Sequence, residues 1–158
     1  IMHLWKGGTE VQLFATPGPT AGSIGVYVPH VGVMFTGDCV VTEMPPLLLE
    51  ADTAVWLETI TQIQNWPKPV RHIVPGRGKL SDMQAATAVA QYIQNMRQQL
   101  KKHIANQLPK EGIYAYQPDI LSQYTDTPLP PEWLKKQVKH SLDHVYDEIQ
   151  LAMGTVEA

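Results

Sequence analysis

The chain has 158 residues, 44% of them hydrophobic and 17% charged, which is enough for one domain with its own core and too few for two. A formal net charge of -3 argues against nucleic acid or an anionic membrane surface as partner, because both need basic patches. No apolar run approaches the roughly 20 residues of a membrane span. The single cysteine cannot form an internal disulfide, and no signal peptide is recognisable, so we expect a cytoplasmic protein.

The first part of the chain is predicted to be β. Residues 9–16 alternate with period two and place Val11, Leu13 and Ala15 on one face. Residues 23–28 and 31–37 are rich in β-formers and meet at the segment "PHVG", whose Pro29 and Gly32 indicate a hairpin. The second of these strands is expected to end at about residue 37.

The period changes to helical at Asp52, which can cap a helix with Trp56, Ile60 and Ile63 on its buried face. Residues 70–74 then predict a short buried strand that runs into a Pro-Gly turn. Ser81, with Gln84 three residues later, forms a predicted capping box for a long helix that reaches about residue 108.

A Pro- and Tyr-containing connector leads to a last helix that begins near Pro131 and ends near Gly154. Its apolar stripe contains Leu134, Val138, Leu142, Val145 and Ile149. Strands packed against helices, with a helical pair at the end, predict an α/β (α+β layered) domain.

Asp38 is the strongest single candidate for chemistry, because it follows a predicted buried strand directly. A carboxylate at a strand end can bind a metal, act as a base or simply cap a turn. The turns "TPGPT" and "VPGRG" present Pro19 and Arg77. Proline can neither bind a metal nor transfer a proton, and arginine is a poor ligand but a good partner for a carboxylate or phosphate.

Residues 11–80 resemble the C-terminal half of the metallo-β-lactamase superfamily, whose landmarks are "TPGHT", "GS", a hairpin, "GD", a helix and "VPGHG". The chain carries "TPGPTAGSIGVYV", "VGVMFTGDCV", "WLETITQIQNW" and "RHIVPGRG" in this order. The segment "WLKKQVKHSLDHVYDEI" is similar to the C-terminal helical extension of hydrolase-like members. The resemblance implies residues 1–80 as half of an αββα sandwich and residues 81–158 as a helical extension packed on it in one structural unit.

The resemblance also implies a dinuclear zinc site, with several ligands from an upstream "HxHxDH" motif that these residues lack. The family's remaining ligand positions fall on Pro19, Asp38 and Arg77, so Asp38 is the only ligand retained. We therefore expect no zinc bound by this chain alone. We also predict that Arg77 occupies the space of the lost metal and pairs with Asp38. An anion site formed by Arg77 with the Gly76–Gly78 turn is an alternative.

The other candidates have structural explanations. His140 and His144 share a helix face that is expected to be solvated, His72 is expected to have a structural role in a strand, and Cys39 is expected to be a small buried residue. The run "PPLLLE" and Trp56 could line a pocket, but core or interface packing explains them more cheaply. Ser23 and Ser81 fit turn and cap positions.

Half of a sandwich would leave one face of its sheet uncovered, which favours a subunit bound to a partner, a homodimer or, as the last possibility, a missing N-terminal half. Because Ile1 precedes Met2, the latter is the preferred explanation, with dimerisation of the chain as its consequence. The leading functional expectation is a superfamily member that is hydrolase-like by descent, with ester, thioester or lactone hydrolysis by a metal-bound water if it is active. A non-catalytic binding or assembly domain is the alternative.

Overall fold

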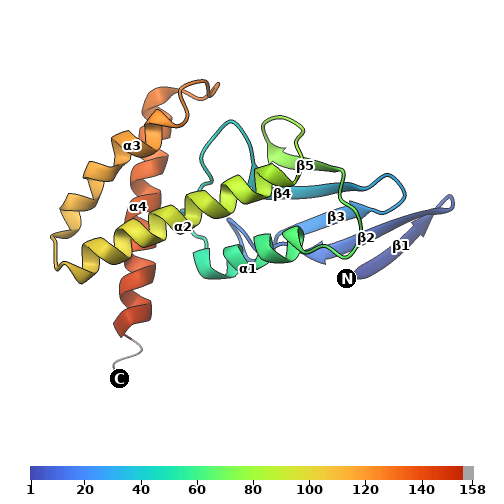
Figure 1. The fold of residues 1–158 in the computed structure, drawn as a ribbon, viewed down its shortest axis with the longest axis horizontal. Coiled ribbons are helices and arrows are strands. Elements are labelled where there is room, and N and C mark those ends of the chain that lie inside the picture. Colours follow the sequence, from blue (N-terminus) through green and yellow to red (C-terminus); the bar gives the residue numbers. More distant parts are fainter. Residues whose placement is uncertain (155–158) are drawn as a thin grey trace.

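The computed structural model describes residues 1–154, which form a five-stranded mixed sheet with helices against one face (Figure 1). The strands lie side by side in chain order, and the first four are antiparallel. The last pair is parallel because a helix connects its strands. The strands are β1 (Met2–Lys6), β2 (Thr9–Ala15), β3 (Ile24–Val28), β4 (Val33–Val41) and β5 (His72–Arg77).

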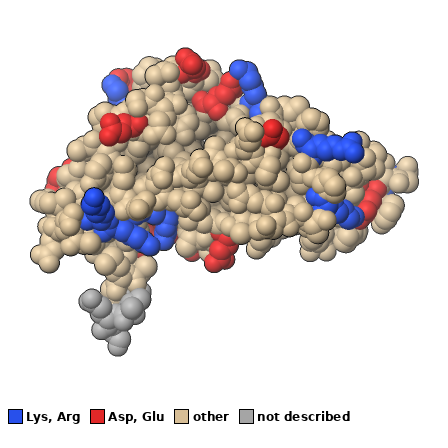
Figure 2. All heavy atoms as spheres, in the orientation of Figure 1, with Lys and Arg blue, Asp and Glu red and all other residues tan. Residues whose placement is uncertain are grey.

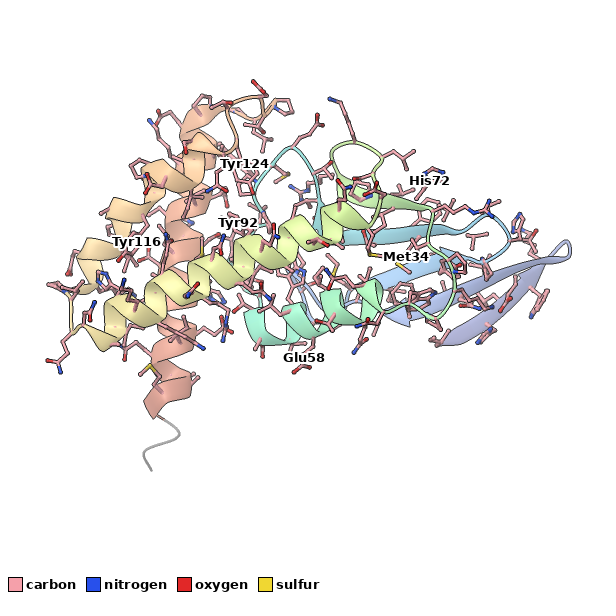
Figure 3. All side chains as sticks on the ribbon, viewed as in Figure 1. Met34, Glu58, His72, Tyr92, Tyr116 and Tyr124 are labelled. Carbon is pink, nitrogen blue, oxygen red and sulfur yellow. The ribbon has the colours of Figure 1, made fainter. Side chains whose placement is uncertain are left out.

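The helices α1 (Thr53–Gln64) and α2 (Met83–Ala105) cover one face of the sheet. Asp52 caps α1 as predicted, since its Oδ1 accepts hydrogen bonds from the amides of residues 54 and 55 at 3.1 and 2.9 Å. The core between the layers contains Tyr27, Met34 and Ile73 from the sheet, and Met34 lies below α2 in Figure 3. The predicted helix face with Trp56, Ile60 and Ile63 is fully buried there.

The opposite face of the sheet is uncovered and apolar, and we call it the open face. The strand registers place one row of apolar residues across all five strands: Met2, Leu13, Val26, Phe35 and Val74. Beside it, Leu4 pairs with Val11 at one end of the sheet, and Val28, Val33 and His72 are paired in turn at the other. None of these side chains is buried, and Leu4 and Phe35 are 47% and 43% exposed. Val11, Leu13 and Ala15 thus share a face as predicted, while Gln12 and Phe14 are buried on the other face.

The C-terminal part adds η1 (Lys110–Tyr116), α3 (Gln117–Ser122) and α4 (Pro131–Gly154), and α4 crosses α2 in Figure 1. The predicted stripe of α4 is buried along its length. Within residues 1–154, none of the helices has the length and apolarity needed to cross a membrane. Figure 2 shows charged side chains scattered over the helix-covered side without a broad basic area.

Several sequence predictions were wrong in detail. The strand β4 continues through Asp38 to Val41 instead of ending before Asp38, and β5 continues to Arg77. The cap of α2 is Asp82, which accepts a hydrogen bond from the amide of Gln84, whereas Ser81 forms an isolated β-bridge with Ile73 of β5. The helix ends at residue 105 rather than near 108.

The histidine predictions had mixed outcomes. His140 is exposed as expected, but His144 is half-buried and its Nε2 donates to the carbonyl oxygen of Ala51 at 2.8 Å. His144 therefore fastens α4 to the segment before α1 instead of lying on a solvated face. His72 is exposed at the outer strand of the sheet (Figure 3), so the structural role predicted for it is not supported by its burial.

Candidate functional site

The fold brings the residues of the three sequence motifs together. Pro19, Asp38 and Arg77 line one pocket of about 250 Å³ at the end of the sheet. They come from the loop between β2 and β3, from β4 and from the end of β5, respectively. Because β4 pairs with β3 on one side and β5 on the other, three motifs that are separated along the chain meet at one site.

A bulge at Gly37 within β4 sets the direction of the Asp38 side chain. Gly37 has a φ of 55°, in the left-handed region that favours glycine, and the register of β4 with β5 shifts on both sides of it. A bulge of this kind turns the side chain that follows it away from the regular alternation of the strand. The Asp38 carboxylate consequently faces the pocket although Asp38 lies inside a strand.

The turn that carries Pro19 is held against the same strand. The Thr16 amide donates to the Ser23 carbonyl oxygen at 2.9 Å and closes the turn. A Cβ atom at Gly18 would lie 3.1 Å from the Cα of Cys39 and 3.3 Å from Trp56, so only glycine fits without displacement. Trp56 also donates from Nε1 to the Cys39 carbonyl oxygen at 2.9 Å, which anchors this part of β4 to α1.

Arg77 is held at the end of β5 and forms an ion pair with Asp38. The Thr42 amide donates to the Arg77 carbonyl oxygen at 3.0 Å, and Arg77 Nη2 lies 3.1 Å from Asp38 Oδ2. The backbone of Gly76 lies so close to Asp38 that a Cβ atom there would overlap its carboxylate. The predicted pairing of Arg77 with Asp38 is therefore confirmed.

The pair is half-exposed, with 49% of the Arg77 side chain and 40% of the Asp38 side chain accessible. Solvent screens such a pair, so it contributes between about 0 and 1 kcal/mol to stability. A buried, strongly coupled pair is thus excluded at this position. Within residues 1–154 the Arg77 guanidinium has Asp38 as its one ion-pair partner, so it keeps N–H groups that are available to a ligand.

An apolar wall completes the pocket, and sequence reasoning singled out the part that comes from "PPLLLE" but not Val41 and Met44. The wall consists of Val41, Met44, Leu47 and Leu49, with Glu50 at the exposed rim. The run "PPLLLE" serves both roles that the sequence left open, because its flanking leucines face the pocket and the central Leu48 is fully buried in the core. Because this segment is short and irregular, its sequence does not show which leucines line the pocket and which is buried in the core.

Cys39 has no role as a nucleophile. Its side chain is fully buried, and burial raises the pKa of the thiol to about 12, so the thiolate is absent near neutral pH. The prediction of a small buried residue is confirmed.

The residues present do not fit a zinc ion. Pro19 has no donor atom, and the permanently charged Arg77 would repel a cation beside Asp38. Within residues 1–154, no group of three or more His, Cys, Asp and Glu side chains is placed to hold a metal.

Solved structures with a similar fold include metallo-β-lactamase proteins. A metallo-beta-lactamase from Pontibacter korlensis matches 60% of this chain and 46% of its own length, with 24% identity and a TM-score of 0.54. A metallo-beta-lactamase family protein from Thermus thermophilus matches 63% of this chain and 35% of its own, with 18% identity and a TM-score of 0.55.

No family model and no curated protein matches the sequence. The chain spans less than half the length of either similar structure. At these sequence identities, the similarity shows a shared fold and nothing more. About three-fifths of this chain adopt part of a metallo-β-lactamase fold. This α+β fold agrees with the family that the sequence motifs resemble.

Proposed function

We propose that the chain is part of a metallo-β-lactamase superfamily protein, hydrolase-like by descent, in which the Asp38–Arg77 pair replaces the metal centre of this segment. The observation that carries the proposal is the meeting of Pro19, Asp38 and Arg77 in one pocket. These are the positions that the resemblance assigns to the family's ligands, and here they supply one carboxylate, one guanidinium and one residue without a donor.

A pocket of this composition is suited to binding. Its apolar wall can hold a hydrocarbon group, while the remaining N–H groups of Arg77 can donate hydrogen bonds to a carboxylate or phosphate oxygen that shares the guanidinium with Asp38. An anion site at Arg77, Gly76 and Gly78 is one form of this function. Small-molecule binding without catalysis is therefore the activity that these residues support by themselves.

Hydrolysis is the second candidate, and the retention of Asp38 in the pocket favours it. In this case the metal ligands would come from a part of the protein outside these residues, such as an upstream "HxHxDH" segment. An ester, thioester or lactone would then be the substrate. The residues of this chain alone support no metal-dependent step.

The replacement of ligands can be tested by restoring them. The double variant Pro19→His/Arg77→His would place two imidazoles beside the Asp38 carboxylate, and three protein ligands with a water are sufficient for zinc. Calorimetric titration with zinc should show one added site in this variant relative to the native chain. Adding Asp38→Asn should remove the site, while background binding by the other histidines stays constant.

Two results would contradict the proposal. One is tight zinc binding by the native chain that Asp38→Asn abolishes, because the site would then be functional as it stands. The other is the same zinc stoichiometry in the double variant and the native chain, with both proteins folded, because the three positions would then not form a remnant of a ligand set.

A further inference from the structure

The ion pair of Asp38 and Arg77 lies in the pocket with both of its charges accessible. It is formed by Arg77 Nη2 and Asp38 Oδ2 at 3.1 Å, and both side chains are half-exposed. The guanidinium carries further N–H donors, and the carboxylate has a second oxygen that accepts hydrogen bonds. A ligand can therefore present an anionic group to Arg77 and a cationic group to Asp38 at adjacent positions. Each charge of the pair would then gain a second partner and keep the first.

Glu50 is the third charged residue of the lining, and it is exposed at the rim. Together with Asp38 it sets two carboxylates against one guanidinium, so the lining has an excess of one negative charge. This excess repels a purely anionic ligand, and a doubly charged phosphate most strongly. A ligand with an ammonium group beside its carboxylate avoids the repulsion, because it is neutral overall and offers the opposite charge to each member of the pair.

An α-amino acid carries these two groups on a single carbon atom. Standard bond lengths and angles place its nitrogen about 2.5 Å from its carboxyl carbon. Its two charges are therefore adjacent, as those of Asp38 and Arg77 are. A peptide carries its terminal charges on different residues, so a free amino acid fits the pair better than a peptide does.

The wall of the pocket determines the side chain of such a ligand. Val41, Met44, Leu47 and Leu49 form an apolar surface, and none of the residues that line the pocket is aromatic. The pocket volume of about 250 Å³ lies below the roughly 300 to 1,000 Å³ of sites for drug-sized ligands, which favours a ligand the size of one residue over a long acyl chain.

We propose that this pocket binds a free α-amino acid with an aliphatic side chain. Its carboxylate would pair with Arg77, its ammonium group with Asp38, and its side chain would pack against the wall. The inference rests on the proposed function, because it names the ligand class of the same pocket.

Calorimetric titration of the native chain with leucine and three related compounds tests this arrangement. Isocaproate is leucine without the ammonium group, isoamylamine is leucine without the carboxylate, and glycine lacks the side chain. Leucine should bind at least ~10-fold more tightly than each of the three, because every deletion removes either a charge-assisted hydrogen bond or the contact with the wall.

Two variants assign the charged groups of the ligand to their partners. Arg77→Gln should weaken the binding of leucine at least ~10-fold and leave that of isoamylamine unchanged, since this amine has no carboxylate. Asp38→Asn should weaken leucine and isoamylamine without weakening isocaproate. Lys79→Gln is the matched control, because Lys79 also forms an ion pair with a carboxylate, that of Glu43, but does not line the pocket. It should leave leucine binding unchanged.

Binding of isocaproate as tight as that of leucine would overturn the amino-acid ligand and leave the proposed function in place, because the pocket would then be an anion site with an apolar wall. Binding of none of the four compounds would overturn the inference, and so would an equal loss of leucine binding in Lys79→Gln and Arg77→Gln. The zinc titration of the double variant does not depend on this ligand, so a failure of the proposed ligand replacement would be recognised separately.

Discussion

Glu148 of α4 connects three helices through one carboxylate. Its Oε1 accepts a hydrogen bond from the backbone amide of Thr53 at 3.0 Å, and its Oε2 accepts one from the Thr53 hydroxyl at 2.6 Å, at the first turn of α1. Arg97 of α2 donates from Nη1 to the same Oε1 at 3.0 Å. The carboxylate therefore joins the C-terminal helix to the two helices that cover the sheet.

The ion pair of Arg97 with Glu148 can be compared with the ion pair of Arg77 with Asp38. Their N–O distances are almost equal, 3.0 and 3.1 Å, but the side chains of Arg97 and Glu148 are only 17% and 21% exposed. Neutralising one partner of a buried pair costs about 3–5 kcal/mol, which we reduce to about 2–3 kcal/mol because a fifth of each side chain still contacts water. The half-exposed pair should contribute about 1 kcal/mol or less.

The isosteric variants Glu148→Gln and Asp38→Asn test this difference, because each removes a charge and keeps the shape. Urea unfolding at pH 7 should show a loss of about 2–3 kcal/mol for Glu148→Gln and within about 1 kcal/mol of the native value for Asp38→Asn. In a chain of this size the first loss corresponds to a decrease in Tm of roughly 4–12 °C. Equal losses for the two variants would refute the argument that burial, rather than distance, decides the contribution of each pair.

Three further predictions concern the site and the core. Cys39 should react with a thiol reagent at pH 8 only after unfolding, because burial raises its pKa to about 12; rapid labelling of the folded chain would contradict this. Gly76→Ala should cost about 1–3 kcal/mol in thermal unfolding through overlap with the Asp38 carboxylate and with the backbone of Gly37 and Asp38, whereas Gly22→Ala, with nothing within 4 Å of the added Cβ, should be nearly neutral. Burial also raises the pKa of the Tyr124 phenol to about 12, so the folded state keeps a proton that the unfolded state loses. Stability should therefore be lost as the pH rises from about 10 towards 12, and Tyr124→Phe should reduce that loss in urea titrations at high pH.

The sequence predicted the elements that carry a regular period. The helix that begins after Asp52 and the stripe of α4 were found because buried positions three and four apart are visible in any amphipathic helix. The strand β1 was not predicted, since its residues are exposed and it exists only through its pairing with β2. The ends of β4 and β5 were also missed. The sequence placed the end of β4 at Gly37, but the bulge at Gly37 lets β4 continue and remain paired with β5 as far as Val41 and Arg77.

From the sequence alone, the resemblance assigned a ligand position to Asp38, and side-chain chemistry predicted that Arg77 could pair with it, because motif order and side-chain chemistry are local properties. It also indicated an apolar sheet with one face left over. The tertiary structure alone decided that the pair is half-exposed and that an apolar wall from the loop before α1 completes the pocket. It also decided which face of each strand the helices cover. Exposure and lining depend on contacts between segments far apart in the chain, and strand alternation shows that two faces exist without showing which of them is packed.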